Sequence, residues 1–376
     1  MEKLLPDICR IQYGFAFDSA KFSDSVGTPL IRIRDVVRGY SETYTTEQCG
    51  DEYVVQDGDM LIGMDGEFNI AHWKGGKAYL NQRVCRLIPT DKINSLYLFY
   101  FMPQALKAIE DKTPFVTVKH LSAKELNKVS VPIPSMAEQE KIATSLQKVD
   151  ELISLRKQQL QKLDELVKAR FIEMFGDCLS NPQGWKTKCL EDIAEVGSSK
   201  RVFVEELREE GIPFYRGTEV GALAEGKQIT PELFITEQHY AELCKATGTP
   251  RIGDLLMPSI CPDGRIWLVN TDKPFYFKDG RVLWVHAIDT SYNPVFLLYT
   301  LKDRIMTDYS SIASGTTFAE LKIFALKKCQ VFDVPITLQN EFAAFIKQTD
   351  KSKLAIQQSL NKLEILKKAL MQKYFG

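Results

Sequence analysis

Residues 131–177 read VPIPSMAEQEKIATSLQKVDELISLRKQQLQKLDELVKARFIEMFGD. Two prolines open this stretch, and Ser135 and Glu138 then stand at the three-residue spacing of a helix capping box. Neither proline nor glycine interrupts residues 135–175, and Gly176 follows where a helix C-cap is expected. The stretch therefore predicts a single helix of about 40 residues, which is a rod of roughly 60 Å.

Apolar residues recur along this predicted helix at intervals of three, four and seven, the pattern of a coiled-coil seam. A second stretch of the same kind, residues 334–376, closes the given sequence. Its seam includes Lys353 and Lys367, whose charges we expect to reach solvent while their stems stay in the seam. The apolar seam residues predicted for the two helices are Ile142, Leu146, Val149, Ile153, Leu160, Leu163, Phe342, Ile346, Ile356, Leu360, Leu363 and Leu370.

The two stretches resemble one another in sequence as well as in pattern. Residues 160–176 (LQKLDELVKARFIEMFG) and 360–376 (LNKLEILKKALMQKYFG) are identical at eight of seventeen positions without a gap. Gln139 and Gln339 correspond at the same shift, and helical periodicity alone does not explain a repeated polar residue. We interpret the repeat as a duplication and expect the two helices to pack on each other; the alternative is that each helix packs only on its own domain.

The segments before the two helices repeat more faintly. Residues 56–61 (QDGDML) resemble residues 251–256 (RIGDLL), and Leu121 recurs as Leu321. Both segments have the short apolar runs and turn residues of small mixed α/β domains with a mostly antiparallel sheet. The predicted organisation is a domain over 1–130, a helix over 131–177, a domain over 178–333 and a helix over 334–376.

Composition limits the function classes. The chain has 376 residues and a net charge of −1, whereas a protein that binds nucleic acid by itself is usually basic. A DNA-binding role would need local basic patches or a partner that supplies phosphate contacts. Eight scattered cysteines, the absence of a signal-like start and the absence of a long apolar run lead us to expect an intracellular protein without a membrane partner.

No stretch carries recognisable catalytic chemistry. The four histidines are separated from each other and from the cysteines, so no metal site is expected. The Asn-Pro-Pro-Phe/Tyr loop of amino-methyltransferases is missing, and no glycine-rich loop opens a cofactor-binding βαβ unit. We therefore interpret the chain as a binding protein without catalytic residues. An enzyme with an unrecognised nuclease or methyltransferase site is the alternative that these observations disfavour.

Basic, acidic, amide and hydroxyl side chains in turn-rich stretches are the candidate DNA contacts. Residues 29–37 alternate apolar and basic types, so we expect a strand there, with Arg32 and Arg34 on one face. A guanidinium can bind a guanine edge through two hydrogen bonds. Arg83 and Arg281 begin predicted core strands, so a structural role competes with DNA contact for both. The candidates are Arg32, Arg34, Asp65, Asn69, Lys74, Lys77, Gln82, Arg83, Thr113, Thr117, Lys119, Arg216, Glu219, Ser259, Asp263, Arg265, Lys278, Arg281, Thr316 and Thr317.

The order of these segments resembles the specificity subunits of type I restriction–modification systems. Residues 132–134 (PIP), 138–139 (EQ) and 174–176 (MFG) match the conserved regions of that family, and residues 182–185 (PQGW) match its preface to a second variable domain. The second conserved region departs from the pattern, because residues 338–339 are LQ where Glu-Gln is usual. The resemblance covers essentially the whole chain and is most specific in the two helices.

The resemblance implies an α+β protein in which two target recognition domains are joined by a long antiparallel two-helix coiled coil with a pseudo-two-fold internal repeat. Each domain would read one half of a bipartite, asymmetric double-stranded DNA target, and the coiled coil would set the gap. Two methyltransferase (modification) subunits would dock on this scaffold and carry S-adenosylmethionine. A restriction subunit, where one joins, would add ATP- and Mg-dependent cleavage.

The chain itself would then bind no cofactor and would act in the cytoplasm of a bacterium or archaeon. The runner-up interpretation is an interaction scaffold that holds two partner subunits without reading DNA.

Overall fold

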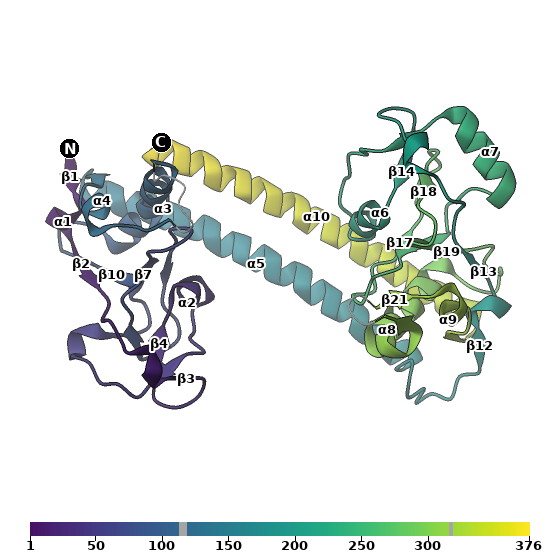
Figure 1. Ribbon diagram of the computed structural model, residues 1–376, viewed down its shortest axis with the longest axis horizontal. Coiled ribbons are helices and arrows are strands. Elements are labelled where there is room, and N and C mark those ends of the chain that lie inside the picture. Colours follow the sequence, from purple (N-terminus) through teal and green to yellow (C-terminus); the bar gives the residue numbers. More distant parts are fainter. Residues whose placement is uncertain (113–118, 316–318) are drawn as a thin grey trace. The chain divides into compact units, whose positions relative to one another are not determined.

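The computed structural model describes residues 1–112, 119–315 and 319–376. The chain divides into two compact units, the first made of Met1–Gln158 with Gln357–Gly376 and the second of Gln159–Ile356. Two long helices, α5 (Met136–Phe175) and α10 (Ile336–Phe375), each contribute one part to either unit (Figure 1). No helix in these described ranges is both long and apolar enough to span a membrane.

Both predicted long helices are confirmed, and the local sequence explains where the first one begins and ends. The N–H of Glu138 donates to the Ser135 hydroxyl at 3.3 Å, and the Glu138 carboxylate accepts from the N–H of Ser135 at 3.1 Å. Hydrogen bonds from the hydroxyl and N–H of Ser135 lower the pKa of Glu138 below its ordinary value. At the other end Gly176 has a φ of 85°, in the left-handed region that favours glycine.

Inside each unit, the parts of α5 and α10 that belong to it run antiparallel. In the first unit Lys367 Nζ lies 2.6 Å from an Asp150 carboxylate oxygen. In the second unit Lys353 Nζ lies 2.6 Å from an Asp164 carboxylate oxygen. Further along α5, Arg170 Nη2 lies 3.2 Å from a carboxylate oxygen of Glu341 on α10. The two seam lysines thus meet aspartates of the opposite helix. All of the predicted apolar seam residues are buried or half-buried.

The domain of the first unit is built in three layers. Its central antiparallel sheet has the strand order β2 (Cys9–Tyr13), β10 (Val84–Pro89), β7 (Met60–Gly63) and β8 (Ile70–His72). Helix α3 (Ser95–Lys112) packs on one face of this sheet. The other face meets a second sheet of strands β3 (Phe22–Ser23), β5 (Tyr44–Thr45), β4 (Thr28–Ile31), β9 (Ala78–Leu80) and β6 (Val54–Val55).

Short elements complete the first domain. Helix α2 (Ile33–Arg38) follows β4, and the pair β1 (Glu2–Leu4) and β11 (Ser130–Pro132) joins the start of the chain to the start of α5. Two further one-turn helices are α1 (Leu5–Ile8) and α4 (Ala123–Leu126).

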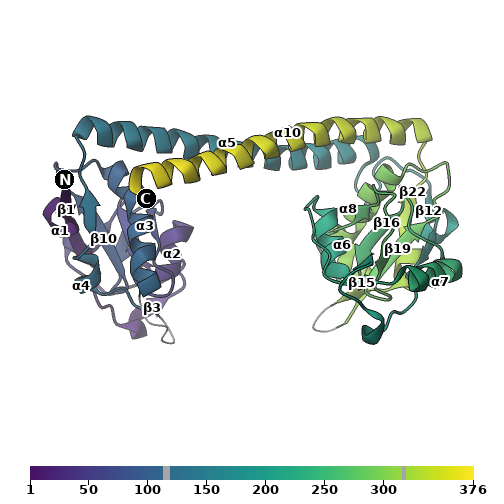
Figure 2. The same cartoon turned by 90° about the horizontal axis from the view of Figure 1, so that it is seen from above.

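The domain of the second unit repeats this plan. Its central sheet runs β13 (Glu195–Gly197), β19 (Val282–His286), β16 (Leu255–Pro258) and β17 (Trp267–Leu268), and α8 (Pro294–Ile312) packs on one face (Figure 2). The second sheet contains β15 (Phe234–Ile235), β14 (Ile212–Tyr215) and β18 (Tyr276–Phe277). The remaining elements are β12 (Thr187–Cys189), β22 (Gln330–Phe332), β20 (Ala313–Ser314), β21 (Glu320–Leu321), α6 (Gly217–Ala224), α7 (Glu237–Thr247) and α9 (Ile323–Lys327).

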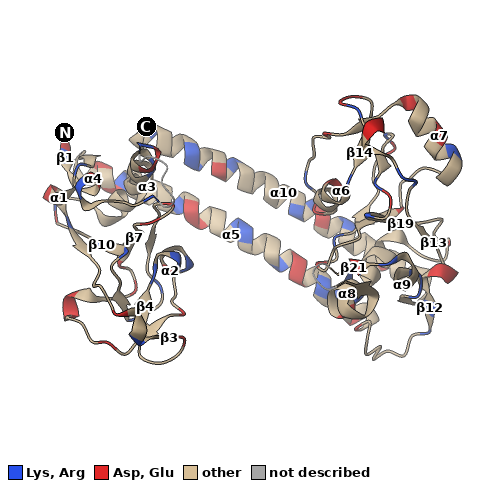
Figure 3. Ribbon diagram, viewed as in Figure 1, with Lys and Arg blue, Asp and Glu red and all other residues tan. Residues whose placement is uncertain are grey.

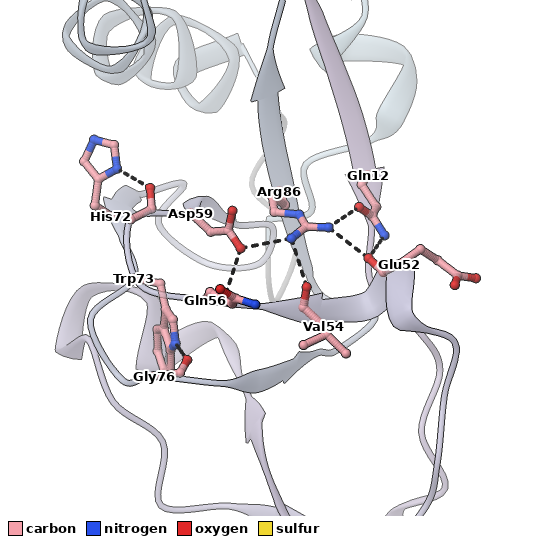
Figure 4. A network of polar contacts seen from close by, with 10 residues as sticks. Gln12, Glu52, Val54, Gln56, Asp59, His72, Trp73, Gly76 and Arg86 are labelled. Atoms are coloured by element: carbon pink, nitrogen blue, oxygen red, sulfur yellow. Dashed lines mark hydrogen bonds and ion pairs between the residues drawn. The ribbon is translucent and has the colours of Figure 1, made fainter.

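Arg86 on β10 is the centre of a polar network in the first domain (Figure 4). Its guanidinium donates to the Asp59 carboxylate and the Val54 carbonyl, both at 2.9 Å. It also donates to the side-chain oxygen of Gln12 at 2.7 Å and to the carbonyl of Glu52 at 2.9 Å. One arginine therefore ties the central sheet to the turn that precedes β7.

The same aspartate turn explains the faint repeat between residues 56–61 and 251–256. The carboxylates of Asp59 and Asp254 each accept from the N–H three residues earlier, at 2.9 and 2.8 Å. Where Arg86 reaches Asp59, Trp284 donates its indole N–H to Asp254 at 3.0 Å. Burial raises the pKa of Asp254 above its ordinary value. The turn is kept, while the side chain that satisfies it differs.

The repeated glutamines connect each long helix to its own domain. The Gln139 side-chain oxygen accepts from the N–H of Asn94, just before α3, at 2.9 Å. The Gln339 oxygen accepts from the N–H of Asn293, just before α8, at 2.8 Å. Both amides also donate to a carbonyl five residues earlier, and they are only 1% and 0% exposed. A buried hydrogen-bonded amide is a structural reason for a polar residue to recur.

The expectation of a strand over residues 29–37 is wrong beyond Ile31. Strand β4 ends there, and α2 begins two residues later. The N–H of Arg32 donates to the Asp35 carboxylate at 2.9 Å, and Asp35 is buried. Asp35 thus stabilises a helix start, as an acid three residues into a capping motif does. Arg32 and Arg34 consequently do not share a strand face.

Candidate nucleic-acid interface

Arg83 and Arg281 occupy the same place in the two domains. Each residue directly precedes the central strand, β10 or β19. The carbonyl of Arg83 accepts from the N–H of Met64 at 3.0 Å, and the carbonyl of Arg281 accepts from the N–H of Ser259 at 2.9 Å. Both side chains therefore leave the backbone at an equivalent place, where β10 or β19 begins beside the end of the neighbouring strand β7 or β16. We call this place the corner of each domain.

The returning segment, which follows α3 in the first domain and α8 in the second, completes this corner. The N–H of Leu121 and that of Leu321 each donate to the carbonyl of the residue just after β7 or β16, both at 2.7 Å. These bonds bring the preceding residues, His120 and Glu320, up to the arginine of their own domain. The repeat of this leucine in the sequence is thus a repeat of the corner.

In the first unit, Asp65 is held between two basic groups. His120 Nδ1 lies 2.6 Å from one carboxylate oxygen, and Arg83 Nε lies 3.6 Å from the other. His120 Nδ1 is also 3.2 Å from Arg83 Nη1. A ring nitrogen that donates to a carboxylate cannot also accept from arginine, so charge attraction to Asp65 holds the arginine here. The Arg83 side chain remains 52% exposed.

In the second unit, Glu320 is the carboxylate between two basic groups. Lys322 Nζ donates to it at 3.1 Å, and Arg281 donates to its other oxygen. The hydrogen bond from Lys322 and the nearby Arg281 charge lower the pKa of Glu320 below its ordinary value. Arg281 is 56% exposed. Each domain therefore offers an exposed guanidinium beside a carboxylate, a set of donors and acceptors suited to polar recognition.

Arg216 and Glu219 are occupied by each other at the start of α6. The Glu219 carboxylate accepts from the N–H of Arg216 at 2.8 Å and from its guanidinium at 2.6 Å. Burial opposes ionisation of Glu219, but the hydrogen bonds from Arg216 outweigh it and lower the pKa to about 2. The backbone bond at this helix start is the one that Arg32 makes with Asp35, so Asp35, Arg216 and Glu219 have a structural role. The Arg32 side chain is exposed.

The other candidates fall into distinct environments. Lys74, Lys77, Gln82 and Lys278 are exposed on their domains. Asn69 is half-buried, and Lys119 Nζ donates to the carbonyl of Glu110 at 2.9 Å. Asp263 and Arg265 form an ion pair at 2.8 Å. Ser259 is 2% exposed, so we do not place it on the DNA-contacting surface. Thr113, Thr117, Thr316 and Thr317 lie outside the described residues.

Charges of both signs are mixed over the molecule. Figure 3 shows Lys and Arg interspersed with Asp and Glu on both domains and both long helices, in line with the net charge of −1. Within the described ranges, no three histidine, cysteine, aspartate or glutamate side chains gather where they could hold a metal ion.

Sequence reasoning missed His120, Glu320 and Lys322. Their signal was present, because they flank the leucine that recurs at positions 121 and 321. It could not be used from sequence alone, since only the folded chain brings these residues to the arginines.

A sequence model of the type I restriction modification DNA specificity domain matches residues 1–165 and 182–365. The chain belongs to this family. Each matched segment of this specificity subunit contains one domain and the first part of the long helix that follows it. Members of the family are DNA recognition subunits of restriction–modification complexes and are not catalytic.

The specificity subunit is similar to several curated relatives. It is 39% identical over 166 residues to the specificity subunit of the type I restriction enzyme EcoBI of Escherichia coli, covering 44% of this chain and 35% of that one. It is 28% identical over 325 residues to the MjaIX specificity subunit of Methanocaldococcus jannaschii, covering 78% and 71%. The chain thus spans about a third of the first relative and most of the second.

Two solved structures share the fold. The S subunit of a type I system from M. genitalium aligns with a TM-score of 0.61 at 14% identity, covering all of this chain and 96% of that chain. A chain from a study of complex assembly and conformational transition of the type I R-M system aligns with a TM-score of 0.58 at 17% identity, covering 100% and 97%. At these identities the likeness concerns the fold alone.

Proposed function

We propose that this chain directs a type I restriction–modification complex to a bipartite, asymmetric DNA target, and that each of its two domains reads one half. The observation that carries this proposal is the duplicated corner. The side chains of Arg83 and Arg281 leave equivalent backbone positions, and both side chains are exposed. The side chains around the two arginines differ between the domains. Two similar frames with different side chains are what two readers of different half-sites require, because base contacts specify sequence.

The long helices are proposed to act as an antiparallel coiled coil that fixes the gap between the half-sites. Two readers on one face of B-DNA lie about one helical turn apart, roughly 34–36 Å. A helix of about 40 residues is roughly 60 Å long and can set such a distance. The ion pairs of Lys367 with Asp150 and of Lys353 with Asp164 support a fixed register.

Two methyltransferase subunits are the proposed partners, and they would carry S-adenosylmethionine; a restriction subunit would bring ATP and Mg²⁺. The mixed charge of this chain supports a shared interface, because partners would then contribute phosphate contacts. Binding by the chain alone is expected to be modest and salt-sensitive.

Shortening the helices tests the spacing role. Deleting seven residues after Gln159 and seven after Ser359 removes one heptad from each helix. In the assembled complex, this double deletion is expected to change the gap and to keep both half-sites. A change in the half-site sequences would refute the spacing role.

A binding assay separates this function from the runner-up. The assembled complex is expected to retard DNA that carries its own methylation motif in a gel-shift experiment. Equal affinity for scrambled DNA would instead favour a scaffold that holds its partners without reading DNA.

A further inference from the structure

The corner residues suggest which base pair is read. We propose that Arg83 with Asp65, and Arg281 with Glu320, each recognise one G·C base pair in the major groove, one pair in each half-site. This inference rests on the proposed function, because it assigns a specificity to the surface through which each domain reads DNA.

The chemistry of the two groups matches the edge of a G·C pair. Guanine presents two acceptors, N7 and O6, which suit the fork of a guanidinium, and cytosine presents the N4 amino donor, which suits a carboxylate. Arg83 Nε and the Asp65 carboxylate are 3.6 Å apart, so donors and an acceptor are offered side by side. With adenine under the arginine, the adenine amino donor would face the guanidinium and the thymine O4 acceptor would face the carboxylate. With thymine under the arginine, the C5-methyl group would stand where guanine N7 accepts the second hydrogen bond of the fork.

The carboxylate argues against phosphate as the target. A phosphate is negatively charged, so the carboxylate beside the arginine would repel it. A base edge carries no net charge and can use both groups. The ionised state of Glu320 is favoured because Lys322 and Arg281 lower its pKa, and His120 holds Asp65 in the other unit.

The two corners reach this arrangement from different positions. In the first unit the acid follows β7 and the returning segment supplies His120. In the second unit the returning segment supplies the acid, Glu320, and Lys322, two residues later, donates to it. The constant member is the arginine, and in both units it is held before DNA arrives. Such preorganisation lowers the conformational cost of binding.

The test uses the complete complex with its modification subunits and a DNA library that is randomised across both half-sites. For Arg83→Ala, the preference for G·C at one position of one half-site is expected to fall by about 5- to 150-fold, with the other half-site unchanged. Arg281→Ala is expected to have the same effect in the other half-site. Arg83→Lys keeps the charge but lacks the fork, so it is also expected to lose discrimination.

Arg10 offers a matched control, because it is an exposed arginine on β2 of the first domain. Arg10→Ala is expected to leave the motif unchanged, and thermal melting checks that all variants fold. The proposal is overturned if Arg83→Ala keeps the full motif, if the relaxed position is an A·T pair, or if all sequences weaken equally with a smaller salt dependence, which is the signature of a phosphate contact. Failure of the unmodified complex to select any bipartite motif would instead overturn the proposed function.

Discussion

The two units share hydrogen-bonded frames but differ in the side chains that fill them. Gln139 and Gln339 have two contacts in common, whereas Asp59 is satisfied by Arg86 and Asp254 by Trp284. A side chain that pairs with a buried backbone group can rarely be replaced, because a buried donor or acceptor must be paired. Side chains between the frames can vary, and this is where a reader of different DNA sequences needs variation.

The largest expected difference between the units lies on the long helices. Phe342 on α10 is fully buried against Phe171, Phe175 and Tyr299, whereas its counterpart in the repeat, Ile142, is half-buried. Phe342→Ala is expected to cost about 3–5 kcal/mol of unfolding free energy, and Ile142→Ala less than half of that. Denaturant unfolding measures both values, and hydrogen exchange in α8 and α3 shows which unit is loosened. Equal costs would contradict the unequal packing.

The glutamine contacts should be equally important in the two units. Gln139→Ala and Gln339→Ala leave the half-buried N–H of Asn94 and of Asn293, respectively, without its acceptor, so each is expected to cost about 1–3 kcal/mol. Gln147→Ala is the control, because Gln147 is exposed on α5 and its amide donates to Glu151 of the same helix. A large cost for one glutamine and none for the other would show that the frames are not equivalent.

Acid unfolding should single out the α6 start in the second unit. Glu219 has its pKa lowered from 4.5 to about 2, so its contribution to stability is present above pH 4.5 and is lost as the pH falls towards 2. Glu219→Gln is expected to flatten the loss of stability in this range. Thermal melting from pH 5 to pH 2 measures it, with Glu237→Gln on the exposed start of α7 as the control. An unchanged pH profile would contradict the role of the Arg216 hydrogen bonds.

The smallest expected effect concerns the ion pair of Asp150 and Lys367. The repeat places Val167 and Asp350 at the corresponding positions of the second unit. Lys367→Ala is expected to cost less than about 1 kcal/mol, because the pair is partly exposed. The cost should shrink further in high salt. A loss of several kcal/mol would mean that this pair is an essential link of the helices.

The sequence predicted those parts of the fold that depend on local signals. The capping residues Ser135 and Glu138 and the C-cap Gly176 each act within a few residues of the helix end. The strand predicted over residues 29–37 was wrong beyond Ile31. Apolar and basic residues that alternate over so short a stretch fit a strand followed by a helix equally well. Asp35, three residues after Arg32, was the signal for the helix.

The candidate interface was only partly predictable. Arg83 and Arg281 could be named from their residue type and their place before a strand. The roles of His120 and Glu320 depend on contacts across about 40 residues of chain or more, which no periodicity encodes. Ser259 shows the opposite case, since a polar residue in a turn-like stretch proved to be buried.

The central claim is that one chain carries two different readers at a fixed separation. Genome-wide mapping of methylated bases, in a host that contains this chain and its modification subunits, tests it most directly. The account predicts a bipartite motif with two unlike halves and a constant unspecified gap. A continuous palindromic motif would contradict it.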